Sequence, residues 1–344
     1  MLIKKLKLHN FKSYIDDVIY FSDVGATTIY GESGRGKTTI IQALKWGLWG
    51  ITDEYLKSNF LNYNIKEKME IGDEENVFVE ITLEAEGREY KITRGVQVEK
   101  GLNGKIRIND RYDCVDANIK NNDILNKNMF NLVFIGNEIR ICMDVVKNIQ
   151  EEYNDKTIRY NDLNRSCKLM EDKLLDIIND YGISEELYKV SLLLHKLEND
   201  FNSMCFPKGN TLNDCIKNEF CSIIQEMGFE WHWETNIWTD FVGFENMSSG
   251  KYMICYIAFI LACRKIQGVD IKQQLPIIIE DCFGHLSNCD KGRLLDYLCK
   301  NNGQIILLCH AVDIELCKDK GKINTEYVLE HNCNEYYTKI RSLS

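Results

Sequence analysis

The N-terminal part of the chain alternates apolar and polar residues with the period of β-strands. Lysine and leucine alternate at 5–8, and the runs VIYF (18–21) and TTIY (27–30) are rich in β-branched and aromatic residues. A longer alternation covers 76–94 and turns back at Glu86-Gly87. The pattern therefore predicts several strands, with an antiparallel pair in the last stretch.

Apolar residues at helical spacing predict helices at 37–50, 216–227 and 249–265. In the first of these, one face carries Ile40, Ile41, Leu44 and Leu48. Two all-apolar runs, 277–279 and 303–309, are typical of buried strands. The mixture of strands and helices predicts an α/β fold.

The composition and the pattern of apolar residues change in the middle of the chain. Residues from about 144 to 206 are charged and rich in asparagine, with apolar residues at helical spacing that break at Tyr181-Gly182. We predict a short antiparallel helical hairpin there, about 50 Å along its longer arm. The expected divisions are an N-terminal lobe (1–143), the hairpin (144–210) and a C-terminal lobe (211–344).

Composition narrows the class of protein. A chain of 344 residues with 44% hydrophobic residues and two prolines is typical of an ordered, packed protein. No apolar run is long enough for a membrane span, and the first residues lack the apolar core of a signal peptide. We therefore expect an intracellular protein that has no membrane partner. The fourteen cysteines are scattered singly, which favours buried free thiols over disulfides or a zinc site.

The net charge of −10 bears on nucleic-acid binding. Proteins that coat nucleic acid usually carry a surplus of lysine and arginine. Contact with DNA would need a local patch, and the basic residues available for it are Lys4, Lys5, Lys7 and Lys12. The solvent face of an edge strand explains the same residues equally well.

The stretch YGESGRGKTTII (30–41) has the spacing of a phosphate-binding loop. Glycines let backbone N–H groups turn onto phosphate oxygens, Lys37 reaches the β- and γ-phosphates, and the Thr38 hydroxyl binds Mg²⁺. A strand precedes the loop and a helix follows it. The positive N-terminal end of that helix also favours a bound anion. The candidate nucleotide-binding residues of the loop are Gly31, Ser33, Gly34, Arg35, Gly36, Lys37, Thr38 and Thr39.

Three later stretches offer further candidate groups, each with an ordinary structural alternative. The strand 277–279 delivers Glu280 and Asp281, which suit a metal shell and a water-orienting carboxylate, although charged strand ends are common. The strand 303–309 ends in His310, and such a histidine is usually structural. The small residues 248–250 open a helix, where they suit either an anion site or an N-cap.

The order of these features resembles that of an ABC-type ATPase head: a phosphate loop, a helical insertion, a serine-rich turn and helix, an acidic strand end and a strand ending in histidine. The sequence is similar to the SMC family, especially the SbcC-type DNA-repair ATPases, such as the ATPase of the eukaryotic MRN complex, and their phage relatives. The opening stretch with Asn10-Phe11-Lys12-Ser13 looks like the family's first strand and turn. The resemblance implies a RecA-like core sheet plus an antiparallel β subdomain.

The resemblance also assigns roles to residues. The phosphate loop, with Lys12 and Ser13 beside it, would hold MgATP. Ser248 and Gly250 match the signature motif that contacts the γ-phosphate of ATP bound to a second copy. His310 matches the switch histidine, and Leu286-Ser287 falls where the family's D-loop, which contacts the second copy, is expected.

Several positions depart from the family pattern. The signature reads Met-Ser-Ser-Gly-Lys (247–251) instead of Leu-Ser-Gly-Gly followed by Gln or Glu. The acidic pair is reversed, which puts Glu280 with Thr38 in the metal shell and Asp281 in the catalytic position. Because Asp is shorter than Glu, slow turnover is expected. Gly136 or Asn137 stands where a metal-contacting glutamine is expected, and the family's long coiled coils and zinc hook are absent from the sequence.

Two functions fit these features. The leading hypothesis is an ATPase that forms a homodimer on binding ATP and acts in DNA repair, recombination or DNA end processing with a nuclease or other effector partner. The alternative is a nucleotide switch that binds a protein partner without acting on DNA, such as a defence or virus-coded effector. A P-loop kinase would not need the turn at 248–250 or the His310 strand.

Overall fold

The computed structural model describes most of the chain outside its middle third. The described residues are 1–50, 60–85, 87–115, 133–135, 165, 169, 212–229, 248–266, 275–280, 284, 286–301, 303–310, 323–332 and 337–343. The chain separates into two compact units, one of Met1–Ile141 with Glu219–Ser344 and one of Cys142–Asn218. The predicted hairpin (144–210) lies almost wholly outside the described residues and stays a prediction.

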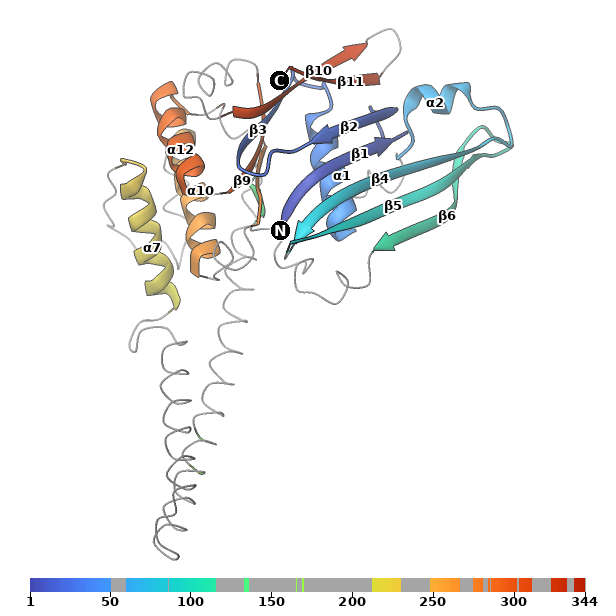
Figure 1. The fold of residues 1–344 in the computed structure, drawn as a ribbon. Helices are drawn as coiled ribbons and strands as arrows, with labels where there is room; N and C mark the ends of the chain where they lie inside the picture. Colours follow the sequence, from blue (N-terminus) through green and yellow to red (C-terminus); the bar gives the residue numbers. More distant parts are fainter. Residues whose placement is uncertain are drawn as a thin grey trace, which may run out of the picture. The chain divides into compact units, whose positions relative to one another are not determined.

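The first sheet of the larger unit is the predicted core sheet, which has the order β11-β10-β3-β9-β8-β7 (Figure 1). All neighbouring strands are parallel except β10 and β11, which form an antiparallel hairpin. The buried runs predicted as strands occupy its centre. The strands are β3 (Gly25–Tyr30), β7 (Phe134–Ile135), β8 (Ile277–Glu280), β9 (Gln304–Cys309), β10 (Ile323–Asn332) and β11 (Tyr337–Ser342).

The second sheet is antiparallel throughout and has the order β2-β1-β4-β5-β6. Its strands are β1 (Leu2–His9), β2 (Asp16–Tyr20), β4 (Glu74–Ala85), β5 (Arg88–Lys100) and β6 (Ile106–Val115). The predicted alternation at 76–94 is confirmed, because every second residue from Val77 to Leu83 is fully buried. Strand β6 escaped prediction because it is intermediate or exposed at every position and has no apolar face.

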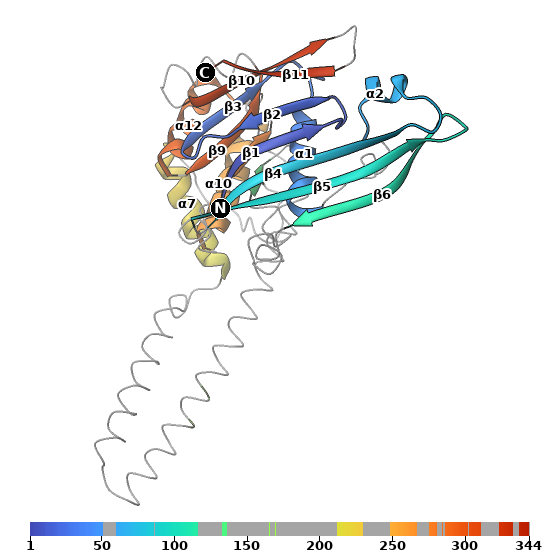
Figure 2. The same ribbon diagram turned by 45° about the vertical axis from the view of Figure 1, so that its right-hand side comes forward.

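Helix α1 (Lys37–Trp49) packs between the two sheets, against β4, β5 and β8 (Figures 1 and 2). A helix covered from both sides has more than one buried face, so Ala43, Trp46 and Trp49 are buried along with the predicted apolar face. The closest approach is at Gly47, where an added Cβ would lie 2.4 Å from Cδ1 of Ile81. Glycine thus allows the helix to lie directly on the antiparallel sheet.

Helices α10 (Ser249–Ile266) and α12 (Asn288–Asn301) lie on the side of the core sheet opposite α1 (Figures 1 and 2). Helix α10 is buried without interruption from Met253 to Arg264, so it forms an inner layer. The predicted helix at 216–227 corresponds to α7 (Leu212–Glu226), and a short α2 spans Tyr63–Lys68. None of the helices in these ranges combines the length and apolar character that crossing a bilayer requires.

Gln304 joins the two sheets through its buried side chain. Its amide nitrogen donates to the carbonyls of Ile3 (2.7 Å) and Ser22 (2.9 Å), and its amide oxygen accepts from the Ile3 N–H at 2.8 Å. These hydrogen bonds lie between β9 and the first strands, where an unpaired amide would be costly. The side chain therefore fixes the N-terminal strand against the core sheet.

The eight cysteines in the described ranges are all free thiols. Cys255, Cys263 and Cys309 are buried as predicted, and burial raises the pKa of Cys255 to about 12. The prediction of burial is wrong for Cys114 and Cys289, which are exposed. Cys114 lies on the polar strand β6 and Cys289 in the first turn of α12, so neither belongs to an apolar face.

Candidate nucleotide site

The phosphate loop joins β3 to α1 through two glycines in the left-handed region of φ. Gly34 has φ 78°, and Gly36, the N-cap of α1, has φ 91°. A Cβ on Gly36 would lie 2.8 Å from both Oγ of Ser13 and the hydroxyl of Tyr14. The same Tyr14 hydroxyl donates to the Gly36 carbonyl at 3.0 Å. Conformation and space together therefore require glycine at this position.

Lys37 lies at the mouth of this loop with a side chain that is already desolvated. It is 8% exposed, and its ammonium donates to the carbonyls of Gly31 (2.5 Å) and Glu32 (3.2 Å). Arg35 does not line the pocket; it pairs with Glu32 at 2.7 Å, and this hydrogen bond lowers the pKa of the Glu32 carboxyl. Lys37 is thus the cation of the loop that lines the pocket beside it.

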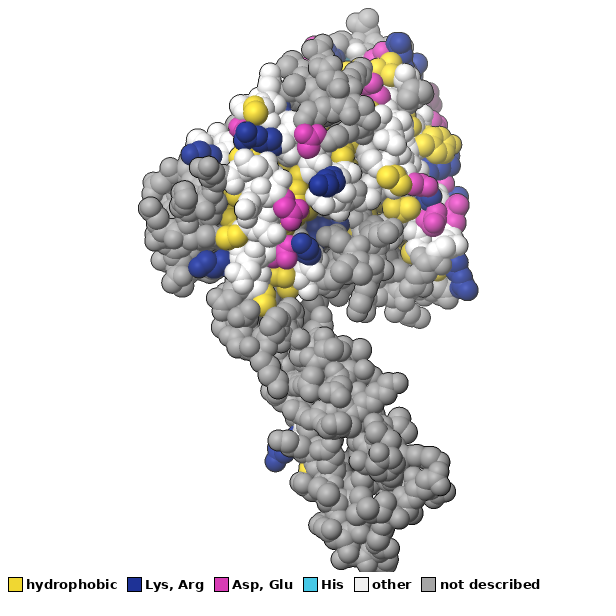
Figure 3. Space-filling model, turned by 60° about the vertical axis from the view of Figure 1, so that its left-hand side comes forward, with side chains coloured by type: hydrophobic (Ala, Val, Ile, Leu, Met, Phe, Trp, Pro, Cys, Tyr) yellow, Lys and Arg dark blue, Asp and Glu magenta, His cyan; other side chains and the backbone are white. Residues whose placement is uncertain are grey.

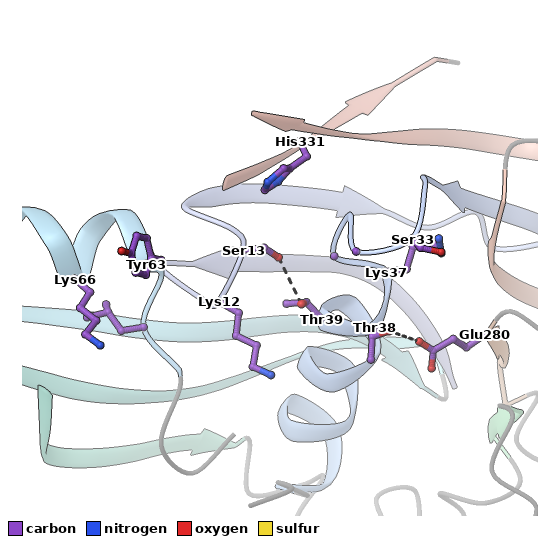
Figure 4. A pocket seen from close by; sticks show the side chains of 13 residues that line it. Lys12, Ser13, Ser33, Lys37, Thr38, Thr39, Tyr63, Lys66, Glu280 and His331 are labelled. Atoms are coloured by element: carbon purple, nitrogen blue, oxygen red, sulfur yellow. Dashed lines mark hydrogen bonds between the residues drawn. The ribbon is translucent and has the colours of Figure 1, made fainter. Parts of the chain in front are cut away.

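The two predicted metal ligands lie side by side. The Thr38 hydroxyl donates to Oε1 of Glu280 at 2.8 Å, although 242 positions separate them (Figure 4). Hard oxygen ligands suit Mg²⁺, and neighbouring ligands about 2.1 Å from an octahedral ion lie about 3 Å apart. The pair therefore fits two adjacent positions in the shell of one magnesium ion.

These residues line one open pocket of about 810 Å³. Most of the predicted nucleotide residues contribute to it, and four residues join them from segments with no predicted role. The described lining consists of Lys12, Ser13, Ser33, Gly34, Gly36, Lys37, Thr38, Thr39, Leu61, Tyr63, Lys66, Glu280 and His331. A pocket of this size accommodates a whole nucleotide, not only its phosphates.

The turn at 10–14 forms a wall of the pocket. Lys12 adopts φ 53° and donates from Nζ to the Gln42 side chain at 2.6 Å, while Ser13 Oγ lies 3.5 Å from the Thr39 hydroxyl. Phe11 anchors the turn by stacking on Trp46 at 5.6 Å between ring centroids. The resemblance that placed Lys12 and Ser13 beside the loop thus agrees with their position.

Tyr63, Lys66 and His331 were missed by the sequence reasoning. Tyr63 and Lys66 stand on α2, and His331 on β10, far from the phosphate loop along the chain. No motif connects these segments. The only local signal is Asn62, a residue type that favours the N-cap of a helix.

Other predicted residues lie outside this pocket. The parallel strands β3, β8 and β9 end at one edge, and His310 follows β9 two residues after Leu308, the register partner of Glu280. Ser248 and Gly250, at the start of α10, do not line the pocket. Asp281, Gly136 and Asn137 lie outside the described residues.

Ser287 has a clear local role. Its hydroxyl lies 2.7 Å from the Asp290 carboxylate and accepts from the Asp290 N–H at 3.2 Å, so it caps α12. Leu286 before it is buried. The D-loop role of this pair stays a prediction.

The N-terminal lysines belong to an internal strand. Strand β1 lies between β2 and β4, so the alternative that placed these lysines on an edge strand is wrong. Lys4 pairs with Asp23 at 2.7 Å and with Glu84 at 2.6 Å, which raise its pKa. Lys5 lies 4.0 Å from Glu80. The positive charge of Lys4 is thus balanced by two carboxylates, whereas Lys12 donates to the neutral side chain of Gln42.

Known proteins share these features of sequence and fold. A family model described as AAA_23, an AAA domain, matches residues 5–220, which is more than half of the chain. The chain belongs to the AAA_23 family. The DNA double-strand break repair Rad50 ATPase of Methanocaldococcus jannaschii is 32% identical to this AAA_23 protein over 101 residues.

That match covers 29% of this chain and 9% of the Methanocaldococcus protein. The chromosome partition protein Smc of Rhodopseudomonas palustris is 29% identical over 58 residues, which cover 17% of this chain and 5% of that protein. The matched part of the AAA_23 chain therefore spans less than a tenth of each of these two relatives.

Solved structures resemble the chain over its whole length. The Smc head domain of Pyrococcus furiosus, bound to the C-terminal domain of ScpA, has a TM-score of 0.55 at 16% identity and covers 99% of this chain and 96% of its own. An Smc head bound to the C-winged helix domain of ScpA has a TM-score of 0.53 at 16% identity, with coverage of 100% and 98%. The AAA_23 chain thus has the predicted fold of an SMC/SbcC-type ABC ATPase head.

Proposed function

We propose that this AAA_23 protein binds MgATP, hydrolyses it slowly, and uses ATP to bring two copies of its head together. The observation that carries the proposal is the hydrogen bond between Thr38 and Glu280, since it puts two Mg²⁺-type ligands beside the phosphate loop. Lys37 and the backbone N–H groups of the loop would hold the phosphates. Bound Mg²⁺ would neutralise charge that develops on the phosphate oxygens.

The proposed hydrolysis assigns different tasks to the two adjacent carboxylates. Glu280 holds the metal shell with Thr38, and Asp281, the next residue after β8, orients the attacking water. His310 follows the neighbouring strand at the same edge of the sheet, which suits a contact near the γ-phosphate. An Asp281→Asn variant should therefore keep MgATP binding and lose phosphate release.

The test of the metal assignment compares ATP affinity with Mg²⁺ and with a chelator. Glu280→Gln should weaken ATP binding about tenfold in the presence of Mg²⁺, because the metal loses one protein ligand. ATP binding in the presence of the chelator should stay unchanged. Glu330→Gln is a matched control, because Glu330 is exposed on β10 and pairs with Arg341 away from the pocket. Equal affinity of the Glu280→Gln variant and wild type in Mg²⁺ would contradict the assignment.

Dimerisation is proposed because one chain holds one phosphate loop and one signature turn. Ser248 and Ser249 are exposed at the start of α10 and stand outside the chain's own pocket. A second copy placed with two-fold symmetry would bring each turn to the other copy's pocket and give two composite sites. Sedimentation with and without ATP, in an Asp281→Asn background that retains ATP, measures this association.

We further propose that the ATP-bound dimer acts on DNA, in repair, recombination or end processing, with a nuclease or other effector partner. The names of the Rad50 and Smc relatives support a DNA-related role. A fall in DNA affinity between two salt concentrations, larger with ATP than without, is the expected result.

A specific observation favours the alternative, a switch that binds a protein partner without DNA. Lys4 pairs with two carboxylates, Lys5 lies 4.0 Å from Glu80, and the net charge is −10. On the face shown in Figure 3, basic and acidic side chains of the described residues are interspersed. ATP-dependent dimerisation without salt-sensitive DNA binding would support this alternative.

A further inference from the structure

A second cavity, of about 440 Å³, lies between three helices of the larger unit. It forms where the end of α7, the first two turns of α10 and the middle of α12 meet, and we call it the three-helix cavity. Among the described residues, it shares no lining residue with the nucleotide pocket. Its described lining consists of Ile224, Gly228, Phe229, Lys251, Ile254, Cys255 and Arg293.

The buried part of this lining is apolar. Ile224 is 2% exposed and Ile254 5%, and Cys255 beside Ile254 is equally buried. Because burial raises the pKa of the Cys255 thiol to about 12, the thiol carries no charge at neutral pH. The inner surface of the cavity therefore suits an aliphatic side chain, which gains free energy when its surface leaves water.

The exposed part of the lining is basic. Lys251 on α10 and Arg293 on α12 are both exposed. In the described part of the chain, neither side chain forms an ion pair with a carboxylate, whereas Lys265, in the last turn of α10, pairs with Glu219 of α7. In a chain of net charge −10, two such cations at one cavity favour an anionic ligand there.

Arg293 is held at the cavity before any ligand binds. Its Nη1 donates to the Gly228 carbonyl at 3.3 Å, and its Cζ lies 5.4 Å from the centroid of the Phe229 ring. Gly228 has φ 79° and accepts this bond directly after the end of α7. A guanidinium has five N–H donors in a planar fork, so one backbone hydrogen bond leaves it able to bind a carboxylate.

We infer that the three-helix cavity binds an acidic peptide segment of a protein partner, with an aliphatic side chain on the apolar lining and carboxylates on Lys251 and Arg293. This goes beyond the proposed function, in which the effector partner has no assigned site. A segment that alternates acidic and aliphatic residues matches both parts of the lining. A nucleic-acid backbone offers no aliphatic group and needs a longer run of cations.

The test measures binding of labelled peptides to the nucleotide-free protein by fluorescence anisotropy. The probes are Gly-Glu-Leu-Glu-Gly, the uncharged Gly-Gln-Leu-Gln-Gly, and Gly-Glu-Ser-Glu-Gly, which lacks the aliphatic side chain. All carry fluorescein at the N-terminus and an amide at the C-terminus. Wild type should bind the first peptide about tenfold more tightly than either of the others, because it loses the charge-assisted hydrogen bonds with one and the apolar contact with the other.

Arg293→Gln should weaken binding of Gly-Glu-Leu-Glu-Gly about tenfold. Its affinity for ATP should stay unchanged, since Arg293 does not line the nucleotide pocket. Lys300→Gln is the matched control, because it removes one positive charge from an exposed position of α12 outside the cavity. Thermal unfolding of each variant at the wild-type midpoint shows that the substitution leaves the fold intact.

Equal binding of the three peptides, an unchanged affinity in Arg293→Gln, or no detectable binding by wild type would overturn the inference. Displacement of the peptide by a lower concentration of a single-stranded oligonucleotide would assign the cavity to nucleic acid instead. Self-association of the nucleotide-free protein that the peptide reverses would assign it to a second copy. None of these measurements depends on affinity for ATP, so the proposed ATP site is tested separately.

Discussion

The phosphate loop and the signature turn share a local design. Each is a stretch of small residues that opens a helix, and neither α1 nor α10 has an acidic residue in its first turn. Their surroundings differ. The phosphate loop is walled by the turn at 10–14, α2 and β10, whereas Ser248, Ser249 and Lys251 are exposed. A helix N-terminus alone therefore does not make a site, and of these two only the phosphate loop borders the pocket that holds Thr38 and Glu280.

The first prediction removes Lys37, the cation of the phosphate loop. Lys37→Ala should lower MgATP affinity about 100-fold, because charge-assisted hydrogen bonds to the phosphates are lost. Calorimetric titration measures the effect. If the Lys37→Ala variant binds ATP with wild-type affinity, the N-terminus of α1 is no better an ATP site than that of α10.

The second prediction concerns the open half-site. Ser248→Arg should prevent ATP-dependent dimerisation through bulk and charge, while the ATP affinity of the monomer stays within about threefold of wild type because the two sites are separate. Sedimentation with ATP and Mg²⁺ gives the first quantity and titration the second. Ser342→Arg, on the exposed surface of β11, is the control substitution. A normal dimer of the Ser248→Arg protein would refute the composite site.

The third prediction compares two loop glycines. It separates the cost of a positive φ from the cost of steric crowding around an added Cβ. Gly36→Ala should cost about 2–4 kcal/mol of unfolding free energy, from the positive φ and from the contacts with Ser13 and Tyr14. Gly34→Ala shares the positive φ but meets no atom within 4 Å, so about 1 kcal/mol is expected. Denaturant unfolding measures both, and equal costs would contradict the packing described around Gly36.

The fourth prediction concerns Asp17 on β2, the strand that follows the turn at 10–14. Burial raises the pKa of Asp17, against a hydrogen bond from the Ile340 N–H that lowers it. A raised pKa in the folded state means that stability is lost as pH rises through that value. Asp17→Asn should therefore be slightly more stable than wild type at pH 7, with a smaller difference near pH 4. A difference that does not change with pH would contradict this account.

Sequence patterns predicted the parts of the site that are local in the chain. The spacing from Gly31 to Thr38 and the apolar strand before Glu280 each carry their own signal, and the fold brings Thr38 and Glu280 together at 2.8 Å. The assigned roles of Asp281, His310 and Ser248 stay predictions.

Residues that depend on distant contacts gave no such signal. Tyr63 and His331 reach the pocket only through α2 and the C-terminal hairpin. The opposite error occurred at Lys4, which the sequence offered as part of a basic patch, because the sequence could not reveal its partners Asp23 and Glu84 from other segments. Pairing between segments is a tertiary property, and periodicity carries no information about it.

The strand order of the core sheet has a consequence for biosynthesis. Strand β3, which carries the phosphate loop, has β9 and β10 as its two neighbours, and both follow it by more than 270 positions. Until the ribosome has added the last part of the chain, β3 has neither neighbour, and its apolar side chains have no sheet to join. We therefore expect the nucleotide pocket to be among the last parts of the protein to form, with β3 unpaired in the nascent chain until then.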